Sequence, residues 1–315
     1  MQDSNGADSK AAKEENVIRS FAELVEAAKA KGPKRVAIAA AHEREVLLAA
    51  VDAERQRLAE CILVGDVPAI QRIAQEEGLD LSRMEMIHVP EPREAARQVM
   101  ALVSHGQADM AMKGRVETGD FLRAALDKEF GIRTGRLLSH VGVFEIPGFD
   151  RLIFVSDAGV VVAPDLEQKV EIVQNAISVA QALGISRPRV AIIAATEMVN
   201  PKIPNTMDAA NLSKMAERGQ IIGGIVDGPL ALDNAISPDA AEVKGIRSEV
   251  AGRADILIVP DIEAGNVLAK AITYFAKGKM AGIVQGGRSP LIVASRADPH
   301  ESKMVSMALG ILLAN

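Results

Sequence analysis

Apolar runs of strand length alternate with amphipathic stretches of helix length along most of this chain, and this alternation constrains the fold more than any other feature. The runs 35–39, 61–64 and 84–89 are each followed by a segment with apolar residues at helical spacing. Strands that alternate with helices of roughly 10–18 residues predict a mostly parallel sheet covered by helices on both faces. The sequence therefore indicates the α/β class.

The rhythm of the alternation changes near residue 140. Two strand-like runs, 137–144 and 152–155, follow each other with Pro147-Gly148 between them, and a long amphipathic helix is predicted at 166–183. Such a break is typical of a domain boundary. We expect two three-layer α/β/α domains with the active cleft between them.

The overall composition argues against nucleic acid as a ligand and favours a cytoplasmic location. The chain has 315 residues, a net charge of −6 and only 3% aromatic residues, so a basic or aromatic platform for nucleic acid is not expected. The single cysteine, Cys61, excludes an internal disulfide and is interpreted as a core hydrophobe. Without a signal-peptide pattern or a long apolar run, the sequence predicts a cytoplasmic protein with no membrane contact.

Polar residues gather after two strand-like runs near the C-terminus. Asp261 and Asn266 come after the run 256–259, whereas Ser295, Arg296 and Asp298 come after the run 291–294. The carboxyl ends of strands form the ligand crevice of an open α/β sheet. An arginine there favours an anionic ligand, and the neighbouring hydroxyl is placed to donate to an oxyanion.

A second polar turn joins the predicted strand 108–112 to the predicted helix 118–127. Lys113, Gly114 and Thr118 in this turn are compatible with a phosphate cradle, although the Walker order is absent and basic turns are often only solvated. Arg123 on the following helix is a weaker candidate, because exposed helical arginines are common.

Carboxylates also follow other predicted strands. Asp157, Asp227 and Asp261 suit either a divalent metal or ordinary caps and turns, and we favour caps and turns. The five histidines lack metal-binding spacing, and neither a G-x-S-x-G nor a G-x-G-x-x-G motif is present. We therefore predict no metal site.

Several of these segments resemble the phosphate acetyltransferase/phosphate butyryltransferase family. The similar stretches are DGPLALDNAI at 227–236, VPDIEAGNVLAK at 259–270, GGRSPLIVASRAD at 286–298 and TGDFLRAAL at 118–126. PKIPNTMDA at 201–209 and SRADPHESK at 295–303 resemble the butyryl branch more than the acetyl branch.

The resemblance implies the fold, the reaction and the assembly. It implies two domains of the isocitrate/isopropylmalate dehydrogenase type, which here would cover 17–138 with 285–315 and 139–284, after a disordered tail at 1–16. It implies reversible transfer of a short acyl group, of butyryl type, between coenzyme A and inorganic phosphate. Coenzyme A would be a substrate, with no tightly bound cofactor. It also implies a homodimer held mainly through the second domain.

The resemblance also assigns roles to residues. The family's Ser-Arg pair matches Ser295 and Arg296, and its helical arginine matches Arg123. The catalytic aspartate of the acetyl branch would fall at Ser302, so we choose Asp298 as the general base and Glu301 as the second candidate. The substrate-binding residues expected in addition are Lys113, Gly114, Thr118 and Asn266.

Three alternatives stay open at this point. The first is a phosphate acetyltransferase. The second is a metal- and NAD-dependent decarboxylating dehydrogenase of the same fold, which would need a cofactor site and clustered metal carboxylates. The third is a coenzyme A-binding regulatory protein that has lost its base.

Overall fold

The computed structural model describes residues 17–314, so the predicted disordered tail at 1–16 lies outside the described residues. The described chain forms two compact units. The first unit holds residues 21–138 and 280–314, and the second unit holds residues 17–20 and 139–279.

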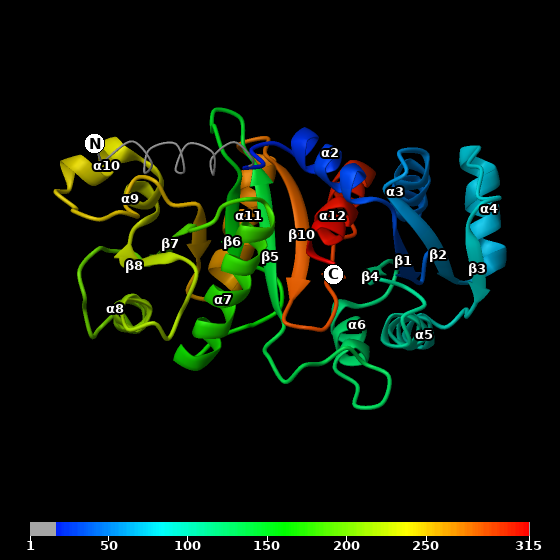
Figure 1. Ribbon diagram of the computed structural model, residues 1–315, viewed down its shortest axis with the longest axis horizontal. Helices are drawn as coiled ribbons and strands as arrows, with labels where there is room; N and C mark the ends of the chain where they lie inside the picture. Colours follow the sequence, from blue (N-terminus) through cyan, green and yellow to red (C-terminus); the bar gives the residue numbers. More distant parts are fainter. Residues whose placement is uncertain (1–16, 315) are drawn as a thin grey trace, which may run out of the picture. The chain divides into compact units, whose positions relative to one another are not determined.

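The first unit is built around a mostly parallel sheet with the strand order β3-β2-β1-β4-β11-β10 (Figure 1). Only β10 runs antiparallel to its neighbour β11. Its elements are α2 (Phe21–Lys31), β1 (Lys34–Ala39), α3 (Arg44–Arg55), β2 (Ala59–Gly65), α4 (Val67–Glu77), β3 (Glu85–His88), α5 (Pro92–Ser104), β4 (Met110–Lys113), α6 (Thr118–Ala125), β10 (Lys279–Gln285, from residue 280 on), β11 (Leu291–Ile292) and α12 (His300–Leu313).

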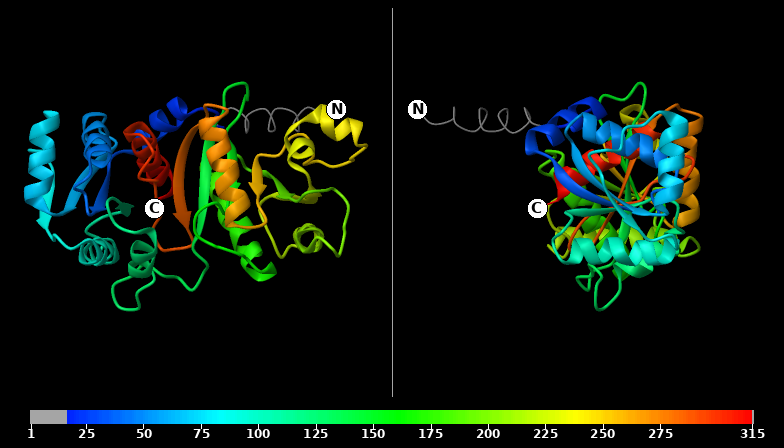
Figure 2. Two further views of the ribbon diagram at one scale, coloured as in Figure 1. Left: turned by 180° about the vertical axis from the view of Figure 1, so that it is seen from behind. Right: turned by 90° about the vertical axis from the view of Figure 1, so that its right-hand side faces the viewer.

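Helices cover both faces of this sheet. The helices α2, α3 and α12 lie on one side of it and α5 and α6 on the other, as both views of the ribbon show (Figures 1 and 2). All four residues of β4 are buried, and so are the last four of β1. A strand that is buried on both faces has apolar residues at successive positions, which explains the apolar runs predicted as strands at 35–39 and 108–112.

The second unit has a sheet with the strand order β5-β6-β9-β7-β8. The hairpin of β5 and β6 is antiparallel, and the other pairs are parallel. Its elements are β5 (Ser139–Glu145), β6 (Ile153–Ser156), α7 (Leu166–Ala182), β7 (Arg189–Ile193), α8 (Pro204–Glu217), β8 (Ile225–Leu230), α9 (Leu232–Ile236), α10 (Pro238–Val243), β9 (Ile256–Ile258) and α11 (Ile262–Tyr274).

Local sequence signals set the starts of several helices. Asp165 and Gln168 form a capping box at the start of α7, with hydrogen bonds of 2.8 and 3.1 Å. Asp66 caps α4 by accepting the Ala69 N–H at 3.2 Å. Because such caps satisfy N–H groups that have no partner within the helix, they fix where each helix begins.

The mostly parallel α/β fold predicted from the alternation is confirmed, and the buried Cys61 in β2 is confirmed as part of the core. Some predicted boundaries were wrong. The helix predicted from residue 17 begins at Phe21, and the strand predicted at 291–294 covers only Leu291–Ile292. Asp227 lies inside β8 rather than after it, because pairing with β7 extends that strand to Leu230. None of the described helices combines the length and the apolar character that a membrane crossing would need.

Candidate active site

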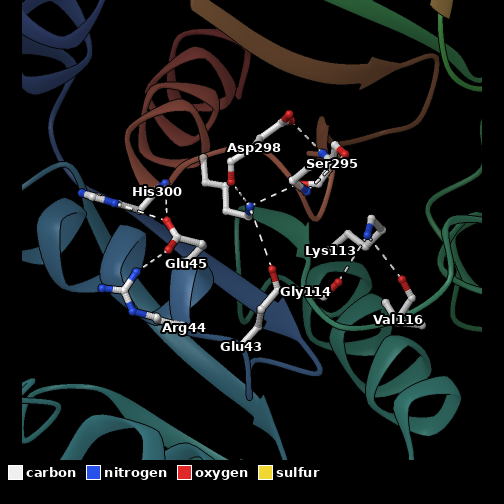
Figure 3. Close-up of polar contacts among 11 residues, drawn as sticks. Glu43, Arg44, Glu45, Lys113, Gly114, Val116, Ser295, Asp298 and His300 are labelled. Atoms are coloured by element: carbon white, nitrogen blue, oxygen red, sulfur yellow. Dashed lines mark hydrogen bonds and ion pairs between the residues drawn. The ribbon is translucent and has the colours of Figure 1, made fainter. Parts of the chain in front are cut away.

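The loops that follow β1, β4 and β11 meet at one edge of the first unit's sheet. Because β4 pairs in parallel with both β1 and β11, the carboxyl ends of these strands lie side by side. Glu43 follows β1, Lys113 ends β4, and Ser295 follows β11 (Figure 3). This edge is where ligands bind in open α/β sheets.

The loop 295–298, which we call the Ser-Arg loop, is closed by its own hydrogen bonds. The Ser295 N–H donates to Asp298 Oδ2 at 2.8 Å, and the Asp298 N–H donates to the Ser295 carbonyl at 3.2 Å. The Ser295 hydroxyl accepts the Ala297 N–H at 3.4 Å. A hydroxyl that accepts a hydrogen bond still has its own proton to donate, so Ser295 can serve a ligand oxygen.

A buried lysine of α12 contacts this loop. Lys303 is 2% exposed, and its ammonium donates to the carbonyls of Ser295 and Asp298 at 3.1 and 2.5 Å. The carboxylate of Glu43 lies 4.0 Å away. Burial lowers the pKa of Lys303, while the nearby carboxylates act in the opposite direction. The Ser-Arg loop is therefore held by a buried cation.

A second buried lysine ends β4. Lys113 is 5% exposed, and its ammonium donates to the carbonyls of Gly114 and Val116 at 3.3 Å each. Burial lowers the pKa of Lys113; the cations Arg296 and Lys303 act in the same direction, and nearby carboxylates oppose them. Lys113 is therefore surrounded by charges of both signs, the cations Arg296 and Lys303 and the carboxylates Glu43 and Glu117.

Gly114 has a packing reason to be glycine. A Cβ at this position would lie 2.5 Å from the Ala39 carbonyl and 2.7 Å from the Ala40 carbonyl. The Gly114 N–H donates to the Ala39 carbonyl at 2.9 Å, which brings the two backbones this close. The close approach explains the glycine without reference to a ligand.

Arg296 is exposed at the edge of the site. Its guanidinium lies 2.5 Å from Glu117 Oε1, and the two side chains are 56% and 74% exposed. An exposed ion pair contributes little to stability. A bound anion can therefore displace Glu117 at small cost.

Arg123 lies in a groove that is lined by other arginines. It pairs with Asp120, which also accepts the Arg93 Nε at 2.8 Å. The groove has a volume of about 270 Å³ and includes Arg97, whose guanidinium lies 5.0 Å from the centre of the Phe130 ring. The contacts of Arg123 are thus with this arginine groove rather than with the Ser-Arg loop.

The remaining predicted residues are not among those that contact the Ser-Arg loop, Lys303 or Lys113 in the hydrogen bonds and ion pairs described above. Thr118 is the first residue of α6, and Asn266 is exposed on α11 of the second unit. Glu301 is exposed, and its carboxylate lies 3.4 Å from His300 Nε2. Between the two candidate bases, only Asp298 is part of the Ser-Arg loop.

Three residues at this edge are not predicted from the sequence: Glu43, Lys303 and His42. The His42 Nδ1 is buried without a hydrogen-bond partner, and burial lowers the pKa of His42, as does the nearby Arg115. For Lys303 a signal exists, because it shares the buried face of α12 with Met307. A lysine on the apolar face of a helix needs a partner.

Within residues 17–314, no group of three or more His, Cys, Asp or Glu side chains is arranged to hold a metal ion. Asp157 and Asp261 instead accept backbone N–H groups, which confirms their interpretation as turn and cap residues.

Comparison with known proteins identifies the family. The family described as "Phosphate acetyl/butaryl transferase" matches residues 20–100 and 91–311. The phosphate butyryltransferase of Clostridium acetobutylicum is 49% identical over 298 residues, which cover 95% of this chain and 99% of that protein. The phosphate acetyltransferase of Thermotoga maritima is 47% identical over 291 residues, which cover 92% of this chain and 98% of that protein.

Solved structures agree with the fold. A branched-chain phosphotransacylase from Enterococcus faecalis V583 superposes with a TM-score of 0.78 at 30% identity, covering 89% of this chain and 98% of that one. A 4-hydroxythreonine-4-phosphate dehydrogenase from Klebsiella pneumoniae shares the fold with a TM-score of 0.53 at 12% identity, covering 90% of this chain and 100% of that one. The predicted dehydrogenase-like α/β fold is confirmed.

The chain belongs to the phosphate acetyl/butyryl transferase family. The resemblance seen in the sequence motifs is therefore confirmed, and with it the prediction of an acyltransferase.

Proposed function

We propose that this chain catalyses reversible acyl transfer between coenzyme A and inorganic phosphate, with butyryl as the preferred acyl group. The motifs of the butyryl branch and the 49% identity to a phosphate butyryltransferase support butyryl, and the 47% identity to a phosphate acetyltransferase keeps acetyl as the second candidate. The observation that carries the proposal is the Ser-Arg loop. This loop of four residues carries a hydroxyl, a guanidinium and a carboxylate, and it follows β11 at the edge where β1 and β4 also end.

The proposed chemistry is a direct attack. In the direction that consumes acyl phosphate, Asp298 accepts the proton of the coenzyme A thiol, because the thiolate is the effective nucleophile. The thiolate attacks the acyl carbonyl carbon, and the Ser295 hydroxyl donates to the oxyanion that forms. The carbon–oxygen bond to phosphate then breaks, which leaves acyl-coenzyme A and free phosphate.

Arg296 binds the phosphate in this proposal. The guanidinium exchanges its single hydrogen bond with Glu117 for a paired hydrogen bond with two phosphate oxygens. The buried ammonium of Lys113 adds positive charge nearby. These cations offset the charge that develops on the phosphate as it leaves.

Arg123 would bind an anionic part of the substrate in the arginine groove. Coenzyme A carries several phosphates and an adenine ring, so a groove with Arg93, Arg97 and Phe130 suits it better than it suits a small ion. Thr118 and Asn266 stay predictions as substrate-binding residues.

We further propose a homodimer in the cytoplasm. Exposed large apolar side chains of the described chain lie almost entirely in the second unit, with Leu126 the exception. They include Met198 at 69%, Val243 at 88% and Phe275 at 88% exposure. Apolar surface gathered in one unit is typical of an interaction surface.

The test of the proposed function is Arg296→Gln, assayed by thiol release from butyryl-coenzyme A in the presence of phosphate. We expect kcat/KM to fall by about 100-fold or more, because a hydrogen bond to a charged phosphate is lost at the transition state. Arg72→Gln is the control, because Arg72 is also an exposed arginine near a carboxylate, with Glu76 at 3.9 Å. Wild-type turnover in Arg296→Gln would reject the role of Arg296, and a trapped acyl-enzyme would reject direct attack.

A panel of acetyl-, propionyl- and butyryl-coenzyme A decides the acyl group. Each additional methylene changes discrimination by only about 1–3 kcal/mol, so kcat/KM must be compared across the panel. Highest kcat/KM with acetyl-coenzyme A would replace the butyryl assignment. Absence of thiol release with every member would overturn the proposed function.

A further inference from the structure

Two lysines donate hydrogen bonds to backbone carbonyls at opposite ends of α12. Lys31 binds carbonyls at the C-terminus of this helix, and Lys303 binds carbonyls of the loop before it. Lys31 donates to the carbonyls of Leu312 and Ala314 at 3.0 and 2.6 Å. Carbonyls at a helix C-terminus lack partners within the helix and carry partial negative charge, so an exposed ammonium is favourable there. General helix electrostatics therefore explain Lys31.

The same argument does not explain Lys303. It lies in the first turn of α12, where the helix dipole disfavours a cation, and it is 2% exposed. Burial of an ammonium is costly unless its donors are used. The carboxylate of Glu43 lies 4.0 Å away, beyond hydrogen-bond distance. The hydrogen bonds of Lys303 go to the two loop carbonyls, and the nearby carboxylates add a favourable charge interaction.

Those two hydrogen bonds join the ends of the Ser-Arg loop. The ammonium binds the carbonyl of Ser295 at 3.1 Å and that of Asp298 at 2.5 Å. The same two residues are also joined by the hydrogen bonds that close the loop. With both carbonyls bound to one ammonium, the backbone of the loop is held at Ser295 and at Asp298, which constrains the direction in which each of these side chains leaves the chain.

We propose that Lys303 is a positioning residue for acyl transfer, which holds the Ser-Arg loop so that the Ser295 hydroxyl and the Asp298 carboxylate address the same acyl carbonyl and thiol. This inference rests on the proposed function. Lys303 itself does not touch the substrate. Its effect is exerted through Ser295 and Asp298.

The experiment is a double-mutant cycle of Lys303→Met and Ser295→Ala, with kcat measured per folded enzyme. Loss of positioning by about 1 Å can lower kcat by about 100-fold, and removal of an oxyanion donor has a similar effect. We expect each single variant to lose about that much. We expect the double variant to be no more than about threefold slower than the slower single variant, because the two changes remove the same interaction.

A matched control separates positioning from loss of stability. Lys31→Met also removes two ammonium–carbonyl hydrogen bonds at α12, but at its other end. We expect its kcat to stay within about twofold of wild type. Melting temperatures of all variants show how much of each change is structural.

Lys303→Arg keeps the cation and its donors if Lys303→Met does not fold. The planar guanidinium cannot place its N–H groups where the ammonium does, so it enters the same cycle with the same criterion. A Lys303 variant with kcat within about threefold of wild type, or with losses that multiply with those of Ser295→Ala, overturns the inference. A Ser295→Ala variant with unchanged kcat also overturns it. Wild-type protein without acyl transfer overturns the proposed function instead.

Discussion

Asp157 in the second unit and Asp298 in the first unit both follow a strand, yet their surroundings differ. Asp157 is 2% exposed, and its carboxylate accepts four backbone N–H groups at 2.7–3.2 Å, those of His140, Gly159, Val160 and Val161. Asp298 is half-buried and accepts the Ser295 N–H at 2.8 Å. One carboxylate is enclosed by the backbone, and the other is partly exposed.

The difference shows what a carboxylate after a strand can do. An enclosed carboxylate organises a turn, because every oxygen lone pair that it offers is used by the chain. Asp261 acts similarly as the N-cap of α11, accepting the Ala264 N–H at 2.8 Å. A general base instead needs room to accept a proton from the substrate. Among these three aspartates, Asp298 alone belongs to a loop with a hydroxyl and a guanidinium.

The largest effect on catalysis is expected for Asp298→Asn. An amide oxygen can still accept the Ser295 N–H, so the loop is kept while the base is lost. We expect kcat to fall by about 10²- to 10⁴-fold. Asp80→Asn is the control, because the Asp80 carboxylate also accepts a backbone N–H in an exposed turn, that of Ser82 at 2.9 Å. Unchanged kcat in Asp298→Asn would move the search for the base to Glu301.

Asp157→Ala should lower the stability of the protein, whereas Asp298→Asn should lower kcat. Removal of the carboxylate leaves the buried His140 N–H without this acceptor and loosens the turn that follows β6. We expect a loss of about 3 kcal/mol in the free energy of unfolding, measured by urea denaturation. Asp150→Ala, at a side chain that is 80% exposed, should change it by less than about 0.5 kcal/mol. Equal effects of the two changes would contradict the structural role of Asp157.

The sequence predicts the fold well because strands that are buried on both faces of a sheet consist of continuous apolar runs. The strands β1, β2 and β4 are visible as apolar runs, and the helices between them as periodic stretches. Short elements are harder to predict. β11 has only two residues, so its extent depends on pairing with β4 and β10 rather than on a pattern of its own.

The site is predictable where its polar residues directly follow an apolar run, as Lys113 and Ser295 do. Ser295, Arg296 and Asp298 lie on one loop, so the motif contains them together. The contact of Lys303 with Glu43 joins residues far apart in the sequence, and it exists because α12 packs on the same face of the sheet as α3 (Figure 1). The sequence does not show that packing, so these residues were missed.

Asp261→Ala tests the capping role at a smaller scale. Loss of an N-cap typically costs about 1 kcal/mol, and the Ala264 N–H loses its acceptor. Urea denaturation measures the change. Glu263→Gln in the first turn of α11 is the control, because it removes only a charge near the helix start and should cost less than about 0.5 kcal/mol. A loss as large as that of Asp157→Ala would mean that Asp261 does more than cap.

The smallest effect on stability is expected for Glu45, whose side chain is 27% exposed. Glu45 accepts the His300 N–H at 2.9 Å and so holds the start of α12 beside the Ser-Arg loop. Burial raises the pKa of Glu45, but hydrogen bonds from His300 and Arg44 outweigh burial and leave the pKa below its usual value. A carboxyl group with a lowered pKa in the folded state adds stability above its unfolded pKa, and that stability is lost as the pH falls through the folded pKa.

Glu45→Gln should therefore flatten the dependence of stability on pH between about pH 5 and pH 3, while the amide still accepts the His300 N–H. The loss at neutral pH should be less than about 1 kcal/mol, because the side chain is partly solvated. Urea denaturation across that range measures it. Glu301→Gln, which changes the 66% exposed carboxylate on the other side of His300, should leave the pH dependence as in wild type. An equal flattening by both changes would contradict the role of the Glu45 contact to the α12 backbone.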